Sequence, residues 1–590
     1  MKLTEWKSVL FLCCAVMFAA ETFAGRKTTA NGKNLIWIIT DEHNLRTLGC
    51  YRDLMSPDQA YMWGEGNAVE TPYIDSLAEN GTLFSRMHAS TPTCTPSRGS
   101  MFTGIYGHNL TVHNNSTKVG DGKYLRSDII TIFDVLKDAG YLTGYAGKWH
   151  LGEHHPLEEK RKHGKWWEPY PLDDPSDSYG IIHNKFMFNG GHEKWYGMVE
   201  NGKPAKANGL DTPTTDGDPY LVWVREPKLD HYKTENGERF DDRIHDEKVD
   251  GKLPFYSDGN TTTVRFQTDW LVDRAKEFIS DFKKDDAYSS FFYVLSIPDP
   301  HSGDRVRAPY NSMYTNMAFE LPKTWNDPNH NPENPYKADA NNPKWIEADG
   351  KAADVHDSRD KGYYTIQDNI AQYFGMVKCI DDNVGRLIKH LEKEALLKDT
   401  VILFTSDHGD LFGEHRRVNK GTPHDMSLRI PFVLVDGSQL VNPVVNHNPM
   451  VPRGKVIEQA GNTIDWMETF LSLLEVNPIP ETPGRDLTPL FDPENLADWN
   501  DVTVTRKYWN AAVDSRHKLV IDFYGKETWL LDNERDPDEV INFIDDPAYD
   551  PVVRKLAKAI KVYMVENDSP DKEVSEEIER LLSRSQRSDI

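Results

Sequence analysis

Short apolar runs alternate with helical patterns along most of this chain, which predicts an α/β fold with a large, mostly parallel sheet flanked by helices. The expected strands are 35–39, 141–146, 291–297 and 401–405. The expected helices are one capped by Asp128 and stopped by Gly140, and those near 264–283, 364–378 and 381–396.

Polar residues follow the expected strands at the points where they end. Asp41, His301, Asp407 and His408 all occupy such positions. Ligands of open α/β sheets gather outside the carboxyl ends of the strands. We therefore expect a binding or catalytic site at this edge.

After about residue 490 the pattern changes to short strands, 518–523 and 528–531, then a turn at 532–537 and a helix at 552–566. This predicts a small C-terminal α+β subdomain with an antiparallel sheet. We divide the chain into residues 1–24, 25–490 and 491–590. The long irregular segments 153–258 and 311–358 are rich in Pro, Asn, Asp and Trp, which suits a binding surface.

The charge balance argues against a nucleic-acid binder. Asp and Glu number 93 against 68 Lys and Arg, and the net charge is −25. Neutralising phosphates requires a basic face, and the sequence has no block of Lys and Arg. An anionic ligand would need a local basic pocket.

Residues 1–24 have the pattern of a secretory signal peptide. Lys2 and Lys7 precede the apolar run 9–20, and cleavage is expected after Ala24. The run is too short to cross a membrane, which needs about 20 apolar residues. We expect an exported protein, periplasmic in a bacterium and otherwise secreted or lysosomal.

The expected mature chain keeps an odd number of cysteines, Cys50, Cys94 and Cys379. At least one thiol is therefore free, capped or converted. Thr95 suits a helix N-cap and Pro96 the first helical position, which would place Cys94 just ahead of a helix N-terminus. That position favours negative charge, but a bland buried thiol remains an equally open interpretation.

The segment 94–98, Cys-Thr-Pro-Ser-Arg, with Thr103-Gly104 after it, resembles the signature of type I sulfatases. In that family the cysteine is oxidised by a formylglycine-generating enzyme to Cα-formylglycine. Further resemblances run in the family's order from about residue 33 to residue 570, and they imply an alkaline phosphatase-like fold. They lie at the strand before Asp41 and in 71–78, 147–152, 300–301, 405–409, 420–422 and 530–537.

The resemblance also implies roles for individual residues. One Ca²⁺ per chain would be held by Asp41, Asp407, His408 and the formylglycine at Cys94. A sulfate ester needs charge neutralisation on its oxygens and a proton for the leaving alcohol. The implied groups are Lys148 and Lys420 on the sulfate oxygens, Arg98 on the formylglycine hydrate, His301 as the general acid and His150 as the base that restores the aldehyde.

Two positions depart from the common family pattern. Glu42 stands where many members carry a second Asp, so its role as a metal ligand stays open. The pair Asp407-His408 replaces Asp-Asn and also occurs in choline-sulfatase-like and phosphonate monoester hydrolase-like relatives. An imidazole nitrogen also tolerates Mn²⁺ or Zn²⁺, which leaves the identity of the metal open.

Each residue also has an interpretation that involves no catalysis. Asp41 and the turn 407–409 could be caps or turns, and Lys148 and Lys420 could be solvated. His154-His155 and the aromatic stretch 166–170 are more typical of surface loops than of substrate contacts. Four arginines near the expected site could bind a second anion or form ion pairs: Arg305, Arg307, Arg416 and Arg417.

Three functions compete. The leading one is an exported carbohydrate sulfatase, because the fifteen Trp and the long aromatic loops suit sugar faces. The second is a phosphonate monoester or phosphodiester hydrolase, or a choline-sulfatase-like enzyme, on the same scaffold. The third is a non-catalytic glycan-binding relative. The glycan, the sulfated position and the oligomeric state cannot be predicted from these residues.

Overall fold

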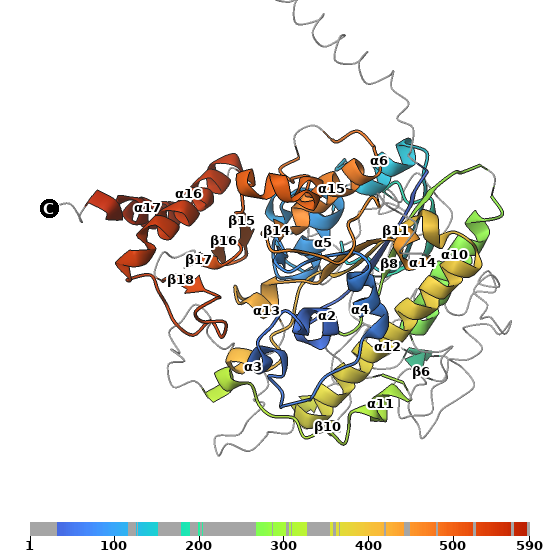
Figure 1. Cartoon of the computed structure of the whole chain (residues 1–590), viewed down its shortest axis with the longest axis horizontal. Coiled ribbons are helices and arrows are strands. Elements are labelled where there is room, and N and C mark those ends of the chain that lie inside the picture. The colour runs from blue at the N-terminus through green and yellow to red at the C-terminus, as the bar shows by residue number, and fades with distance from the viewer. Residues whose placement is uncertain are drawn as a thin grey trace, which may run out of the picture.

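The structure is a computed structural model of the chain (Figure 1). Residues 1–31, which include the expected signal peptide, lie outside the described part, and so do most of the two long irregular segments. The described residues are 32–115, 125–126, 128–151, 179–188, 199–200, 203–204, 267–285, 287–301, 306–307, 309–326, 355–357, 362–364, 366–417, 420–441, 449–479, 482–522, 527–567 and 571–586.

An eight-stranded mixed sheet forms the centre of the protein. Its middle strands β11, β1, β8 and β4 run parallel, and β12 is antiparallel to β11. Their carboxyl ends therefore meet at one edge. In sheet order the strands are β13 (Lys455–Ile457), β2 (Thr82–Phe84), β12 (Phe432–Asp436), β11 (Thr400–Ser406), β1 (Asn34–Thr40), β8 (Phe291–Ser296), β4 (Leu142–Lys148) and β5 (His183–Phe188).

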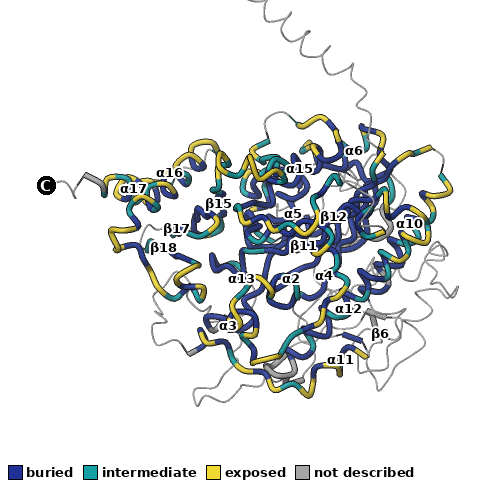
Figure 2. The backbone as a smooth tube through the Cα atoms, viewed as in Figure 1, coloured by how far each residue is buried: buried dark blue, intermediate teal, exposed yellow. Residues whose placement is uncertain are grey.

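Both faces of the sheet are buried. In β1, Ile36 and Ile38 face one apolar cluster, and Leu35, Trp37 and Ile39 face the other. This follows from the two-residue period of a strand, and it explains why the strand has a continuous apolar sequence. Figure 2 shows the sheet as the most deeply buried part of the chain.

Helices cover each face. The cluster of Ile36 includes residues of α4 (Pro72–Glu79), α10 (Gln267–Phe282) and α12 (Ile366–Lys393). The cluster of Trp37 includes α5 (Cys94–Thr103), α6 (Ile132–Asp138) and α15 (Trp466–Leu473). The predicted α/β class with a mostly parallel sheet flanked by helices is confirmed.

Three local predictions were wrong. The two helices expected at 364–378 and 381–396 form the single α12, because apolar residues such as Ile380 and Val384 continue one buried face across the expected break. Asp128 does not cap α6; Thr131 does, in a reciprocal capping box with Asp134.

The third correction concerns the start of α5. Thr95 lies within this helix, Cys94 is its first residue and Thr93 is the residue before it. The Thr93 backbone has the extended conformation typical of a residue that precedes a helix. Cys94 therefore belongs to the first turn, one residue further into the helix than expected.

The C-terminal part contains a four-stranded antiparallel sheet, as predicted, formed by β15 (Thr503–Arg506), β16 (Trp509–Val513), β17 (His517–Asp522) and β18 (Thr528–Asp532). Two helices, α16 (Asp550–Glu566) and α17 (Lys572–Leu582), pack on it around a separate apolar cluster. In Figure 1 this sheet and its helices lie beside the main sheet. The division at residue 490 stays a prediction.

The remaining described elements are short: α2 (Gly49–Arg52), α3 (Pro57–Ala60), α11 (Tyr310–Met313), α13 (Asp425–Leu428), α14 (Ser438–Val441), β3 (Met87–His88), β6 (Val199–Glu200), β7 (Lys203–Pro204), β9 (Val355–Asp357), β10 (Gly362–Tyr364) and β14 (Gly461–Asn462). Within the described residues, none of the helices combines the length and apolarity needed to cross a membrane.

Candidate active site

Three of the parallel strands place polar residues at one edge of the sheet. Asp41 follows β1, Asp407 follows β11, and Lys148 is the last residue of β4. Backbone hydrogen bonds join these strand ends, from Asp407 N to Thr40 O at 3.2 Å and from Asp41 N to Asp299 O at 3.2 Å. The expected clustering at the carboxyl edge is therefore present.

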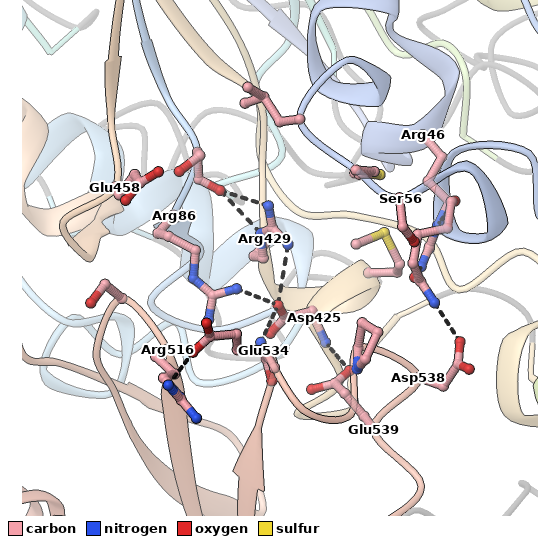
Figure 3. A pocket seen from close by; sticks show the side chains of 18 of the residues that line it. Arg46, Ser56, Arg86, Asp425, Arg429, Glu458, Arg516, Glu534, Asp538 and Glu539 are labelled. Atoms are coloured by element: carbon pink, nitrogen blue, oxygen red, sulfur yellow. Dashed lines mark hydrogen bonds and ion pairs between the residues drawn. The ribbon is translucent and has the colours of Figure 1, made fainter.

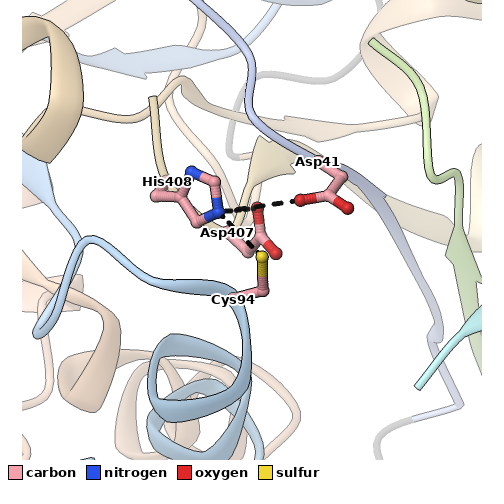
Figure 4. A group of neighbouring side chains, drawn as sticks. All are labelled: Asp41, Cys94, Asp407 and His408. Carbon is pink, nitrogen blue, oxygen red and sulfur yellow. Dashed lines mark hydrogen bonds and ion pairs between the residues drawn. The ribbon is translucent and has the colours of Figure 1, made fainter. Parts of the chain in front are cut away.

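Cys94 reaches this edge from α5. Its side chain is fully buried, and Sγ lies 3.2 Å from Nε2 of His408. Asp41, Cys94, Asp407 and His408 together form a compact buried group in which one ligand atom from each lies within 4.8 Å of the others. In Figure 4, dashed lines join one imidazole nitrogen of His408 to both carboxylates and to the sulfur.

Hydrogen bonding leaves His408 Nε2 directed at this group. Nδ1 lies 2.9 Å from the carbonyl oxygen of Gly409, which can only accept, so Nδ1 carries the proton. Nε2 then has a free lone pair and lies 3.7 Å from Asp41 Oδ1 and 3.6 Å from Asp407 Oδ1. This orientation is the one that a metal-binding histidine requires.

The donor set fits a divalent cation. Asp41 Oδ1 is buried and has no hydrogen-bond partner among the described residues. A buried carboxylate oxygen without a partner is costly unless a cation approaches it. Two carboxylates suit Ca²⁺, and the imidazole nitrogen also suits Mn²⁺ or Zn²⁺.

Arg98 holds Asp407 in place from one turn into α5. Its Nε donates to Asp407 Oδ2 at 2.8 Å, and Nη1 donates to Ser296 Oγ and to the Lys148 carbonyl, each at 2.7 Å. Burial disfavours the charge, but Asp407 and Asp41 raise the pKa of Arg98 above its ordinary value. This arginine links α5, β4, β8 and the end of β11, so it makes the site rigid.

Lys148 is buried and forms an ion pair with Asp41 Oδ2. Burial would lower the pKa of Lys148, but the charges of Asp41 and Cys94 raise it. Burial alone would raise the pKa of Asp41. The positive charge of Lys148 opposes this effect, and the resulting pKa of Asp41 lies below its ordinary value. Both side chains are therefore charged at neutral pH.

Glu42 is not one of the four residues of the metal cluster, and its Oε1 is buried without a hydrogen-bond partner among the described residues. Its Oε2 lies 2.7 Å from Lys420 Nζ and 3.1 Å from His301 Nε2. Burial and the nearby charge of Lys420 lower the pKa of His301, but Glu42 and Asp41 outweigh them and raise it to about 9. His301 is therefore protonated at neutral pH, with 15% of its side chain exposed.

The charges around Cys94 favour a thiolate. Burial alone would raise the pKa of the Cys94 thiol, yet the nearby positive charges of Lys148 and Lys420 lower it well below its ordinary value. A hydrogen bond from His150 acts in the same direction. His150 is itself buried and has a left-handed backbone, with φ at 55°. The position at 94 thus lies in a strongly electropositive pocket.

All nine predicted site residues lie at this edge: Asp41, Cys94, Arg98, Lys148, His150, His301, Asp407, His408 and Lys420. Of the two interpretations of Arg307, the structure supports the ion pair and not the binding of a second anion. The side chain is buried and paired with both carboxylate oxygens of Asp269. Cys50, Cys94 and Cys379 are all outside disulfides. His154-His155, residues 166–170, Arg305 and the side chain of Arg416 lie outside the described residues.

Sequence analysis missed three residues close to the site. Ser296 accepts from Arg98, and Asn115 accepts at 3.1 Å from the Thr95 backbone, with its Nδ2 4.0 Å from Cys94 Sγ. Lys507 comes from the C-terminal sheet and interacts electrostatically with Lys420 and Cys94. Ser296 lies within an expected strand, next to its last residue, but the other two stand in segments with no recognisable local pattern.

A separate cavity of about 620 Å³ lies between the main sheet region and the C-terminal sheet (Figure 3). Asp425 is central to it: Arg86 lies 2.8 Å and Lys518 2.6 Å from its carboxylate oxygens. Asp425 begins α13, and Ser427 Oγ in that helix accepts from the Gly421 backbone at 3.0 Å. None of the described residues that line the cavity belongs to the metal cluster, so we interpret it as a junction that supports the Lys420 segment.

The fold and this edge place the chain in the alkaline phosphatase-like superfamily. A family model described as Sulfatase matches residues 33–476, and one described as N-sulphoglucosamine sulphohydrolase, C-terminal, matches residues 413–566. The first spans more than half of the chain. The chain therefore belongs to the sulfatase family and is a sulfatase enzyme.

Individual relatives are distant but similar over nearly their whole length. The chain is 24% identical over 602 residues to an N-acetylglucosamine-6-O-sulfatase of Bacteroides thetaiotaomicron, covering 96% of this chain and 93% of that one. A solved putative sulfatase of Bacteroides fragilis has a TM-score of 0.61 at 20% identity, covering 94% and 98%. The phosphonate monoester hydrolase of Agrobacterium radiobacter has a TM-score of 0.59 at 20% identity, covering 92% and 97%.

Proposed function

We propose that this protein is an exported carbohydrate sulfatase that removes sulfate from a sugar ester, using Cys94 matured to formylglycine and one divalent cation, Ca²⁺. The observation that carries the proposal is the environment of Cys94. Its sulfur is buried against His408 and lies in the field of Lys148 and Lys420. A position built this way stabilises an anionic nucleophile and the negative charge of a sulfate group.

Formylglycine, as its hydrate, would supply the oxygen nucleophile, and the cation would be held by Asp41, Asp407, His408 and residue 94 and would supply charge neutralisation. The protein's own residues do the rest. Lys148 and Lys420 bind the outer sulfate oxygens. Arg98 keeps Asp407 in its ligand orientation through the 2.8 Å contact. His150 accepts a proton at residue 94.

His301 protonates the leaving sugar oxygen when the ester S–O bond breaks. Glu42 suits it to this role because its carboxylate raises the pKa of His301 to about 9, which keeps a proton available at neutral pH. Sugar alcohols are poor leaving groups, so the proton is needed in the transition state. Glu42 therefore acts on the acid rather than on the metal.

The substrate class follows from the relatives and the composition. The N-acetylglucosamine-6-O-sulfatase relative is named for a sulfated sugar. The chain contains 15 Trp and 25 Tyr, and aromatic rings bind sugar faces. We also propose export, with cleavage after Ala24, which N-terminal sequencing of secreted protein would test by finding Gly25 first.

Sulfate release from a panel of sulfated mono- and disaccharides tests the proposal directly. The protein is produced together with a formylglycine-generating enzyme, and peptide mass verifies the conversion at residue 94. The expected result is release from one sugar position, with none from Cys94→Ala. An active Cys94→Ala protein would overturn the mechanism.

A second candidate is a phosphonate monoester or phosphodiester hydrolase. It is favoured by His408 in the cluster and by the similar fold of the Agrobacterium radiobacter enzyme. Matched sulfate, phosphodiester and phosphonate esters of one alcohol separate the two. Faster turnover of the phosphorus esters by converted protein would select this candidate.

A further inference from the structure

The turn between β15 and β16 lies close to the catalytic residues although it belongs to the C-terminal sheet. It consists of Lys507 and Tyr508 and is closed by a 2.9 Å hydrogen bond from Lys507 N to Trp509 O. Next to it, the Arg506 backbone donates to the Ser90 carbonyl at 2.9 Å. Ser90 lies in the segment that leads into α5, so the turn is attached to the segment that carries Cys94.

The Lys507 ammonium group is packed against Gly421, the neighbour of Lys420. A Cβ added at Gly421 would lie 2.4 Å from Lys507 Nζ, so the ammonium group would have to move away. Gly421 also has a left-handed backbone, with φ at 96°. The glycine thus leaves room for a second lysine beside Lys420.

Lys507 differs from the other cations of the site in having no anionic partner. Lys148 is paired with Asp41, Lys420 with Glu42 and Arg98 with Asp407. Within the described part of the chain, no hydrogen bond or ion pair of Lys507 Nζ is present. Burial lowers the pKa of Lys507 to about 8, and the charge of Lys420 contributes in the same direction.

Two partly buried cations side by side destabilise the protein unless an anion comes between them. The scissile sulfate would be bound by Lys148 and Lys420. Lys507 lies further out, next to Tyr508, which is 61% exposed and whose hydroxyl is 3.3 Å from Asn114 Nδ2. The adjacent Asn115 is the residue whose amide lies near Cys94. The turn therefore lies at the rim of the site.

We propose that Lys507 is a substrate-binding residue that pairs with a second anionic substituent, a sulfate or a carboxylate, on the sugar that carries the scissile ester or on the adjoining sugar. This rests on the proposed function, since it assumes a sulfated sugar at Cys94. Lys507 takes no part in bond breaking. It selects substrates by charge, which adds a specificity that the catalytic group alone does not have.

The test uses pairs of sulfated sugars that differ by one anionic group. One pair is N-acetylglucosamine 6-O-sulfate and glucosamine N,6-O-disulfate, and others pair sulfated hexose disaccharides with their uronate counterparts. Binding is measured by calorimetry to Cys94→Ser, which cannot turn over. In at least one pair the dianionic sugar should bind about tenfold or more tightly, and Lys507→Met should remove that difference.

The type of pair that responds distinguishes a sulfate from a carboxylate as the second anion. Lys507→Arg should retain most of the difference because it keeps the charge. Lys572→Met in α17 is the matched control, since it removes one positive charge from a side chain that is 88% exposed and far from the site in sequence. It should leave both affinities unchanged.

Two results would overturn the inference. The first is that the dianionic sugar binds no more tightly than its partner in any pair, and the second is that Lys507→Met lowers the affinity for both members of a pair equally. Turnover by the matured wild-type enzyme is followed on the same pairs. Absence of sulfate release together with a Lys507-dependent difference in affinity would count against the proposed function alone. Release that is insensitive to Lys507 with every dianionic sugar would count against the inference alone.

Discussion

Lys420 Nζ lies 2.7 Å from Oε2 of Glu42, although 378 residues separate the two in the chain. Glu42 is the neighbour of Asp41, yet only Asp41 belongs to the metal cluster. The Glu42 carboxylate instead joins Lys420 to His301. The lysine proposed to bind sulfate and the proposed general acid therefore share one carboxylate, which couples the charge of one to the protonation of the other.

His301→Ala should slow sugar sulfates by about 100-fold or more, because general acid catalysis contributes roughly 10² to 10⁴ in rate. Aryl sulfates leave without a proton, so their kcat should fall by less than about tenfold. The measurement is kcat on both classes with protein converted at residue 94. Equal losses on the two classes would remove His301 as the acid.

Glu42→Gln should lower the pKa of His301, because its carboxylate is the charge that most favours the protonated imidazole. The acid is protonated below its pKa, so activity on sugar sulfates falls as pH rises through that value. In the wild type this alkaline limb is expected near pH 9. In Glu42→Gln it should move to lower pH, as pH profiles of kcat would show. An unshifted limb would separate His301 from Glu42.

Ca²⁺ should raise the melting temperature of the wild-type protein after treatment with a chelator. A ligand present at 100 times its Kd adds about 2.7 kcal/mol to the free energy of unfolding. Asp407→Asn removes one charged ligand and should abolish most of this shift. Asp285→Asn, in the turn after α10, is the control. The proposed ligand set fails if calcium stabilises Asp407→Asn as much as the wild type.

Lys518→Met should destabilise the protein by roughly 3 kcal/mol, because it leaves the buried Glu539 without its cation, whereas Asp425 keeps Arg86. Lys518 is fully buried and lies 2.6 Å from Asp425 and 2.5 Å from Glu539. Lys561→Met, which breaks the exposed pair with Glu579, should cost less than about 1 kcal/mol. Urea unfolding of the two variants makes the comparison, and similar values would contradict a structural role for the junction.

Glu539 should make the protein less stable as pH rises. An ordinary paired carboxylate, whose pKa is lowered by folding, has the opposite effect. Burial raises the pKa of Glu539 from 4.5 to about 7, although Lys518 opposes this. Between these values the folded protein binds more protons than the unfolded chain, so the free energy of unfolding falls as pH rises from about 5 to 7. Glu539→Gln should flatten this slope, which unfolding at pH 5, 6 and 7 would detect.

Local patterns were sufficient to predict the strands that end at Asp41 and Asp407, because a strand buried on both faces has a continuous apolar sequence that ends where the chain leaves the sheet. They failed where the signal was weak. The predicted break before Asp381 does not exist, because this residue accepts from the backbone of α4 at 2.9 to 3.0 Å and stays within α12. The hydrogen bonds between Asp381 and α4 exist only because α4 packs against α12, which the sequence around Asp381 does not indicate.

The sequence by itself determined the class of fold, the strand ends and the segment around Cys94, since each depends on residues close together in the chain. Tertiary structure decided which charges meet. The carbonyl of Glu42 accepts from Tyr373 Oη at 2.8 Å, and the residue has φ at 61°, a left-handed backbone. Contacts of this kind, made across hundreds of residues, direct Asp41 to the metal cluster, Glu42 to His301 and Lys507 to the rim. They depend on how whole elements pack, which no local pattern records.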